Sequence, residues 1–204
     1  MIYKLIEIVL KTKKPSTWLK LLAFFGLLPS ELSRLSGVPQ SPKHHPEGDA
    51  LIHTFMAVDE AARWVHEVPK EWRRAYMWGL LYHDVGKYIK TDYETLSSID
   101  HEKAGAHIAE YFLINHFWSK GSSGNALQED YYKIVKIVEN HMSPLLLTKQ
   151  GSKRRAWFRL HRKIPLNVVA YVALADRDGR GNEKQGKDAE YFKVCMSYFE
   201  LCKN

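Results

Sequence analysis

The sequence contains few of the features that mark secreted or membrane proteins. Only two of its 204 residues are cysteines, Cys195 and Cys202. On a helix these would lie two turns apart, too far for an easy disulfide, because the Cα atoms must come within about 7 Å. The longest apolar run, at residues 21–28, is much shorter than the roughly 20 residues that span a bilayer, and no signal-peptide cleavage site follows it. We therefore expect a reduced, cytoplasmic protein with no membrane partner.

Signals for β-strands are also scarce. Alternation of polar and apolar residues is rare, and no Asn-Gly or Asp-Gly pair lies between strand-like runs. Apolar residues instead recur every three or four positions, which is typical of helices packed on a core. The pattern predicts an all-α protein of about nine or ten helices, at residues 2–12, 16–28, 50–68, 69–84, 100–117, 130–142, 152–162, 165–176 and 188–202, with a short helix near residue 30.

Acidic residues are in the minority. Lys and Arg number 30 against 23 Asp and Glu, which gives a formal net charge of +7. This moderate excess is compatible with an anionic substrate or with nucleic acid, without requiring either.

The segment "LLYHDVGKYIK", residues 80–90, places a histidine and an acid together at the end of an apolar run. Burying His83 and Asp84 is costly unless something pairs with them. One interpretation is a metal site, and the other is a helix end with Gly86 as its cap. Adjacent side chains on a helix point about 100° apart, so both can reach one ion only if the helix ends there, which Gly86 would permit.

Other histidines and one aspartate occupy similar positions. His53, His101, His141 and Asp176 lie on apolar faces or at helix ends, and each alone is more often a satisfied polar residue than a ligand. Together, imidazoles and carboxylates suit divalent metals such as Mn, Ni, Fe, Zn or Mg. His107 is expected to be a packing residue instead.

The order of these residues resembles a known family. His53, His83-Asp84 and Asp176 match the "H…HD…D" signature of the HD-domain metal-dependent phosphohydrolases, and "HDVGK" matches its HD-x-G-K form. The segments "GVPQSPKHHPEGDALIHT", "DHEKAGA", "ENHM" and "ALADRDGRG" resemble, in order, the HD domain attached to some bacterial CCA-adding tRNA nucleotidyltransferases. The resemblance covers about residues 15–182 and implies an HD-domain helical bundle.

The resemblance implies roles for individual residues. His53, His83, Asp84 and Asp176 would hold a first metal ion. His101 and His141 would hold a second one, although the sequence leaves open whether one ion or two are bound. The catalytic residues would be Asp84, as a bridging or water-orienting ligand, and Lys87, as a contact to a phosphate oxygen.

Several cations and loop residues are candidates for substrate binding. Lys87 is expected either to contact phosphate or to be a solvated cation at a helix end. Arg180 is a second candidate for the same contact. His45 and Glu47 would line the pocket mouth or order their loop.

A basic stretch at residues 149–163 adds Arg154 to these candidates. Basic and aromatic side chains are interleaved there, as in surfaces that bind unpaired nucleic acid. The alternative is an ordinary amphipathic helix with solvated arginines.

We expect one HD domain over residues 1–204, with N-terminal helices at 1–40, the catalytic core at 41–182 and a C-terminal helix at 183–204. Because only a few dozen residues precede the core, we expect a stand-alone hydrolase and not a CCA-adding enzyme. Its substrates would be phosphomonoesters or 2′,3′-cyclic phosphates of nucleotides or RNA ends. The alternatives are a nucleotidase or (d)NTP triphosphohydrolase, and an RNA-binding module with a structural or inactive metal site.

Overall fold

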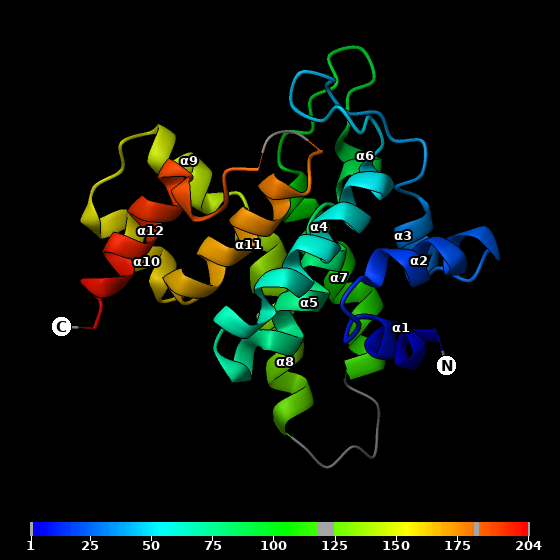
Figure 1. Ribbon diagram of the computed structural model, residues 1–204, viewed down its shortest axis with the longest axis horizontal. Coiled ribbons are helices and arrows are strands. Elements are labelled where there is room, and N and C mark those ends of the chain that lie inside the picture. Colours follow the sequence, from blue (N-terminus) through cyan, green and yellow to red (C-terminus); the bar gives the residue numbers. More distant parts are fainter. Residues whose placement is uncertain (1, 118–124, 182–183, 204) are drawn as a thin grey trace.

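The protein is built from α-helices. The computed structural model describes residues 2–117, 125–181 and 184–203, and in these ranges it has twelve α-helical segments and no strand beyond one isolated bridge between Pro39 and Asp49. The all-α prediction is confirmed. In chain order (Figure 1) the helices are α1 (Ile2–Val9), α2 (Pro15–Phe24), α3 (Ser30–Ser33), α4 (Ala50–Trp64), α5 (Arg73–Tyr82), α6 (Lys87–Lys90), α7 (His101–Phe117), α8 (Asn125–Asn140), α9 (Ser143–Lys149), α10 (Arg154–His161), α11 (Leu166–Asp178) and α12 (Glu190–Glu200).

The centre of the bundle is formed by α4, α5, α8 and α11. In Figure 1, α1 to α3 lie at the N-terminal end, and α9, α10 and α12 lie at the C-terminal end. Helix α11 packs against both α4 and α12, and α5 and α7 both pack against α8. Large side chains such as Trp78 and Trp157 are fully buried, and burying a side chain of this size contributes on the order of 2–3 kcal/mol.

The start of α4 and the end of α11 determine where His53 and Asp176 lie. The Asp49 carboxylate caps α4 by accepting hydrogen bonds from the backbone amides of Leu51 and Ile52, at 2.8 and 3.0 Å. This cap sets His53 one turn into the helix, on its buried side. At the other boundary, α11 ends at Asp178 and Gly179, two residues after Asp176.

Glycines allow close approaches between backbones near the same residues. Gly86 has φ −69°, so it is not the left-handed helix cap that the sequence suggests. A Cβ atom there would lie 2.0 Å from the carbonyl oxygen of His101 and 2.6 Å from the amide nitrogen of Gly105. Gly179 likewise lets the end of α11 approach the backbone of α4, because a Cβ atom there would lie 2.6 Å from the Cα of Ala57. Glycine is needed at both positions for space and not for an unusual φ.

Some predicted boundaries were wrong. The sequence pattern predicts a helix that starts at residue 130, but α8 begins at Asn125. Residues 118–124 and the expected boundary at 182–183 lie outside the described residues. Helix α9 was missed, because Ser143 and Pro144 look like a break although Pro is favourable in a first helical turn. Among the described helices, none is both long and apolar enough to cross a bilayer.

Candidate metal centre

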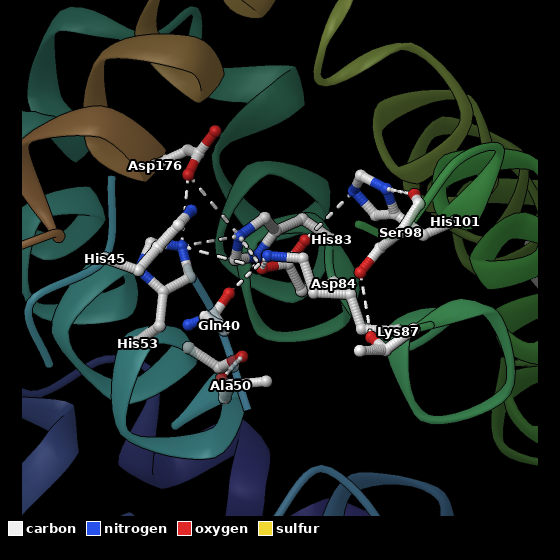
Figure 2. A network of polar contacts seen from close by, with 12 residues as sticks. Gln40, His45, Ala50, His53, His83, Asp84, Lys87, Ser98, His101 and Asp176 are labelled. Atoms are coloured by element: carbon white, nitrogen blue, oxygen red, sulfur yellow. Dashed lines mark hydrogen bonds and ion pairs between the residues drawn. The ribbon is translucent and has the colours of Figure 1, made fainter. Parts of the chain in front are cut away.

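Side chains from five parts of the chain converge at one buried place. Each of five elements contributes at least one side chain: helix α4, the turn after α5, the start of α7, the turn after α8 and the end of α11. The side chains that converge there are all buried, and Figure 2 shows Asp84 and His83 between Asp176 on one side and His101 on the other. The converging side chains are His53, His83, Asp84, His101, His141 and Asp176.

Asp84 lies between two pairs of histidines. Its Oδ2 atom is 3.3 Å from Nε2 of His83 and 3.6 Å from Nε2 of His53. Its Oδ1 atom is 3.2 Å from Nε2 of His101 and 3.8 Å from Nε2 of His141. Each oxygen of one carboxylate therefore faces a different histidine pair.

Asp176 faces the histidine pair formed by His53 and His83. Its Oδ1 atom lies 3.1 Å from Nε2 of His53 and 3.8 Å from Nε2 of His83. Asp178, the other acid at the end of α11, points elsewhere, since its Oδ1 accepts hydrogen bonds from the backbone amides of residues 185 and 186. Only Asp176 of these two acids faces the histidines.

The outer nitrogen of each histidine is held in place. Nδ1 of His83, His101 and His141 lies 2.7–2.8 Å from the backbone carbonyl oxygen three residues earlier. Because a carbonyl oxygen only accepts, Nδ1 carries a proton, and in the neutral form of each ring the Nε2 lone pair faces Asp84. Nδ1 of His53 lies 2.9 Å from Oε1 of Glu47, which favours the same tautomer.

This arrangement concentrates lone pairs in a small space. The Nε2 atoms of His53 and His83 are 3.3 Å apart, and those of His101 and His141 are 3.2 Å apart. Asp84 Oδ2 is buried in the same space, and the ammonium of Lys87 lies 2.7 Å from it. Crowded acceptors without donors are unfavourable unless a cation joins them, and Nδ1 bonds to outer acceptors are the usual support of metal-binding histidines. The residues fit divalent metal ions.

The pKa shifts of three groups in the cluster agree with ligand roles, whereas nearby carboxylates raise the pKa values of His53 and His101 against the effect of burial. Burial alone would raise the pKa of Asp84, but the neighbouring charges of His83 and Lys87 hold it well below the usual range. Burial opposes ionisation of Asp176 as well, yet Arg180 and His53 keep its pKa low. Burial, together with the charges of two neighbouring histidines, lowers the pKa of His141 to about 3. At neutral pH these groups are thus two carboxylates and a neutral imidazole, the forms that bind metals.

Two cations adjoin the carboxylates. Lys87 is 7% exposed, with Nζ 2.7 Å from Oδ2 of Asp84 and a hydrogen bond to Oε1 of Gln40. This burial rules out the solvated helix-end interpretation of Lys87. Nη2 of Arg180 donates to both oxygens of Asp176, at 3.2 and 3.1 Å. Both cations line the cleft that leads to the histidines.

The two loop candidates have different positions. His45 lines the cleft, and its Nδ1 lies 2.8 Å from Oε1 of Glu47. Glu47 lies behind His53 instead, with its carboxylate shared between the two histidines. Burial opposes the ionisation of Glu47, but hydrogen bonds to His45 and His53 lower its pKa to about 2. Glu47 is therefore placed to orient His53.

Replacing Glu47 with glutamine tests this orienting role. We expect Glu47→Gln to weaken divalent-metal affinity by about 10- to 100-fold, the usual effect of losing an outer partner of a histidine ligand. Metal titration followed by calorimetry would measure it. The exposed Glu200→Gln should leave affinity unchanged, and equal affinity in both variants would show that Glu47 only orders its loop.

Two predicted residues lie away from the cluster. Arg154 lines a separate hollow between α10 and the C-terminal residues, with its guanidinium 4.6 Å from the centre of the Phe158 ring. The structure does not bring Arg154 together with Asp84. His107, expected to pack, has a largely exposed side chain.

Sequence reasoning missed several residues of the cleft, among them Gln40 and Arg177. Gln40 lies in the Gly/Pro-rich loop and gave no local signal, because its role depends on the distant Lys87. Arg177 also lines the cleft. It stands in the "ADRD" segment between two acids, which gives the appearance of an ordinary charged helix end.

Four histidines and two aspartates converge inside a helical bundle, beside two cations that line the cleft, and form a candidate metal site. Comparison with known families agrees. The HD domain family matches residues 42–180, so the chain belongs to the HD domain family. The resemblance found in the sequence is confirmed. Membership suggests a metal-dependent phosphohydrolase, and the His/Asp cluster could hold the metal.

Similar proteins include several with one name. The chain is 48% identical over 184 residues to a multifunctional CCA protein of Halorhodospira halophila, covering 89% of this chain and 41% of the relative. It is 33% identical over 186 residues to a multifunctional CCA protein of Pseudomonas fluorescens, covering 89% and 42%. The chain thus spans less than half the length of these relatives.

Proposed function

We propose that the protein hydrolyses phosphomonoesters and 2′,3′-cyclic phosphates of nucleotides or RNA ends with the help of two divalent metal ions. The observation that carries this proposal is the position of Asp84, whose two oxygens face separate histidine pairs. A carboxylate shared in this way is a common bridge between two ions in phosphate-cleaving sites.

The ligands divide between two sites. One ion would be held by His53, His83 and Asp84, together with the neighbouring Asp176, and the other by Asp84, His101 and His141. Bound there, divalent ions would supply an activated water near neutral pH and polarise the phosphoryl oxygen. Mn, Ni, Fe, Zn and Mg all accept such a mixed donor set, and we take Mn and Ni as the first ions to test.

Lys87 and Arg180 would orient the reacting phosphate. Each neutralises one of the buried carboxylates and also lines the cleft. Nε of Arg180 is buried without a hydrogen-bond partner, so one donor is free for a phosphate oxygen. Charge-assisted bonds of this kind stabilise the charge that develops on the phosphoryl oxygens.

The cleft is large enough for a nucleotide. It has a volume of about 590 Å³, within the usual range for small-molecule sites. Part of its lining is apolar and suits a base or a ribose face, through Leu96, Ile99, Met142 and Leu145. The net charge of +7 also favours a polyanionic substrate, and the name of the relatives, multifunctional CCA protein, makes an RNA end a reasonable first substrate.

Hydrolysis assays test the proposal directly. We expect chelation to abolish release of phosphate from nucleoside 2′- and 3′-monophosphates and opening of 2′,3′-cyclic phosphates, and Mn²⁺, Ni²⁺ or Mg²⁺ to restore both. Nucleoside triphosphates serve as the comparison, because release of intact triphosphate would favour a triphosphohydrolase. Purified protein without bound metal, but with salt-sensitive RNA binding, would favour the binding module and contradict the proposal.

A further inference from the structure

The charges that line the cleft do not balance. Among the described residues of its wall, the only carboxylates are those of Asp84 and Asp176. Four cationic side chains face them: Lys87, Lys149, Arg177 and Arg180. Lys87 is paired with Asp84, and Arg180 with Asp176, so two cations in the described wall have no carboxylate of the cleft to neutralise them.

Arg177 is the more informative of these two. Its side chain is partly buried, and its Nε atom is buried without a hydrogen-bond partner. No ion pair joins it to any acid in the described parts of the chain. The neighbouring Asp178 is turned toward the backbone amides of residues 185 and 186. A partly buried guanidinium without a partner is costly, and an anion that enters the cleft would remove that cost.

Lys149 is the last residue of α9 and lines the same cleft. It is exposed, and within the described residues it forms no ion pair. Met142 and Leu145 line the cleft along with it and provide an apolar surface near these cations. An exposed ammonium binds an anion only weakly by itself, but Lys149 adds a second positive charge to the cleft that Arg177 lines.

We infer that Arg177 and Lys149 form a second anion subsite, which binds a phosphate of the substrate other than the one that is hydrolysed. The inference rests on the proposed phosphohydrolase function and predicts that, among its substrates, molecules with at least two phosphates are preferred. Lys87 and Arg180 are occupied with the carboxylates beside the reacting phosphate, whereas Arg177 and Lys149 have no such task. Guanidinium and ammonium groups together recognise phosphate by charge and by directed hydrogen bonds.

Two kinds of substrate carry a second phosphate. One is a terminal nucleotide with a phosphate on its 5′ oxygen, as at the end of an RNA chain, and the other is a nucleotide with a polyphosphate chain. Both offer the same chemistry to Arg177. Comparing a 5′-phosphorylated cyclic phosphate with a nucleoside triphosphate separates them.

The experiment compares matched probes on the metal-loaded protein. Adenosine 2′,3′-cyclic phosphate has one phosphate, and its 5′-phosphorylated form has two. We expect kcat/KM to be about tenfold higher for the second probe, mainly through a lower KM, as for one charge-assisted contact at a partly exposed site. In Arg177→Gln this preference should disappear, while hydrolysis of the first probe stays within about twofold.

Two further variants test the second residue of the subsite and provide a control outside the cleft. Lys149→Gln, at an exposed position that cannot affect folding strongly, should reduce the preference by about threefold. Arg159→Gln, an exposed arginine of α10 outside the cleft, should leave the preference intact. Equal kcat/KM for both probes in the wild type, or equal losses on both in Arg177→Gln, would overturn the inference.

Failure of the proposed function gives a different result. If no probe is hydrolysed with any metal, that function fails, and the subsite is tested by calorimetry with adenosine 3′-monophosphate and adenosine 3′,5′-bisphosphate. A tenfold tighter Kd for the bisphosphate, lost in Arg177→Gln, supports the subsite, and equal Kd values contradict it. Tight binding of adenosine triphosphate alone would assign the subsite to a polyphosphate chain.

Discussion

Replacing Asp84 with asparagine should reduce hydrolysis by about 10³-fold or more with every metal. The amide keeps the shape of the carboxylate but removes the negative charge that faces both histidine pairs. Stabilisation of several kcal/mol by bound ions is then lost, and each 1.36 kcal/mol corresponds to a factor of ten in rate. Elemental analysis of the purified variant should show loss of both ions, and steady-state assays should show the loss of rate.

Asp178→Asn is a matched control for that variant. Asp178 is also a buried acid at the end of α11, but its carboxylate accepts a hydrogen bond from the backbone amide of Gln185, outside the cluster. It should retain metal and activity. Because Asp84→Asn leaves Lys87 buried without its ion-pair partner, thermal unfolding of both variants must accompany the assays. Hydrolysis by a folded Asp84→Asn at the wild-type rate would show that the cluster is not the active site.

The residues of the cluster could be predicted from the sequence because their chemical types are unusual for their positions. His83 and Asp84 follow an apolar helix, and His53, His141 and Asp176 lie at comparable places, so one explanation accounts for all of them. That explanation rests on residue type and order, which the sequence contains in full. The helical fold was predictable for a similar reason, since apolar periodicity extends through most of the chain.

The supporting groups could not be predicted in this way. The Nδ1 atoms of the histidines are held by backbone carbonyls, which every residue has, and Gln40 meets Lys87 only through the tertiary fold. Arg177 carries no signal in the sequence either, because whether an arginine lacks a partner depends on where the neighbouring acids point. Contacts of this kind depend on three-dimensional packing, which a local pattern does not describe.

Gly86 could be identified from the sequence as important, but the reason for its importance could not. Its place in "HDVGK" marked it as important, but the sequence suggested a helix cap, and its ordinary φ of −69° shows another requirement. The turn after α5 lies directly on the first turn of α7, where His101 begins the helix. The missing side chain of Gly86 therefore sets how closely Asp84 approaches His101, at 3.2 Å between Oδ1 and Nε2.

Gly86→Ala should consequently destabilise the protein and damage one half of the site. The new Cβ atom would lie 2.0 Å from a backbone oxygen, which cannot move aside as a side chain could. Overpacking against rigid backbone lies at the upper end of the usual range, about 3 kcal/mol, so the Tm should fall by about 6–12 °C for a chain of this size. Since α7 carries His101 but neither His53 nor His83, we expect the bound metal to fall from two ions to one.

The control for Gly86→Ala separates steric clash from backbone conformation. Gly151 has φ +57° and open space around its Cα, so Gly151→Ala carries only the conformational cost of about 1 kcal/mol. Thermal unfolding and metal analysis of the two variants should differ clearly. A Gly86→Ala protein that melts within about 2 °C of the wild type and keeps two ions would show that α7 can shift without loss of His101. Retention of one ion together with the expected drop in Tm would mean that the contact between the two backbones holds the histidine pairs on either side of Asp84.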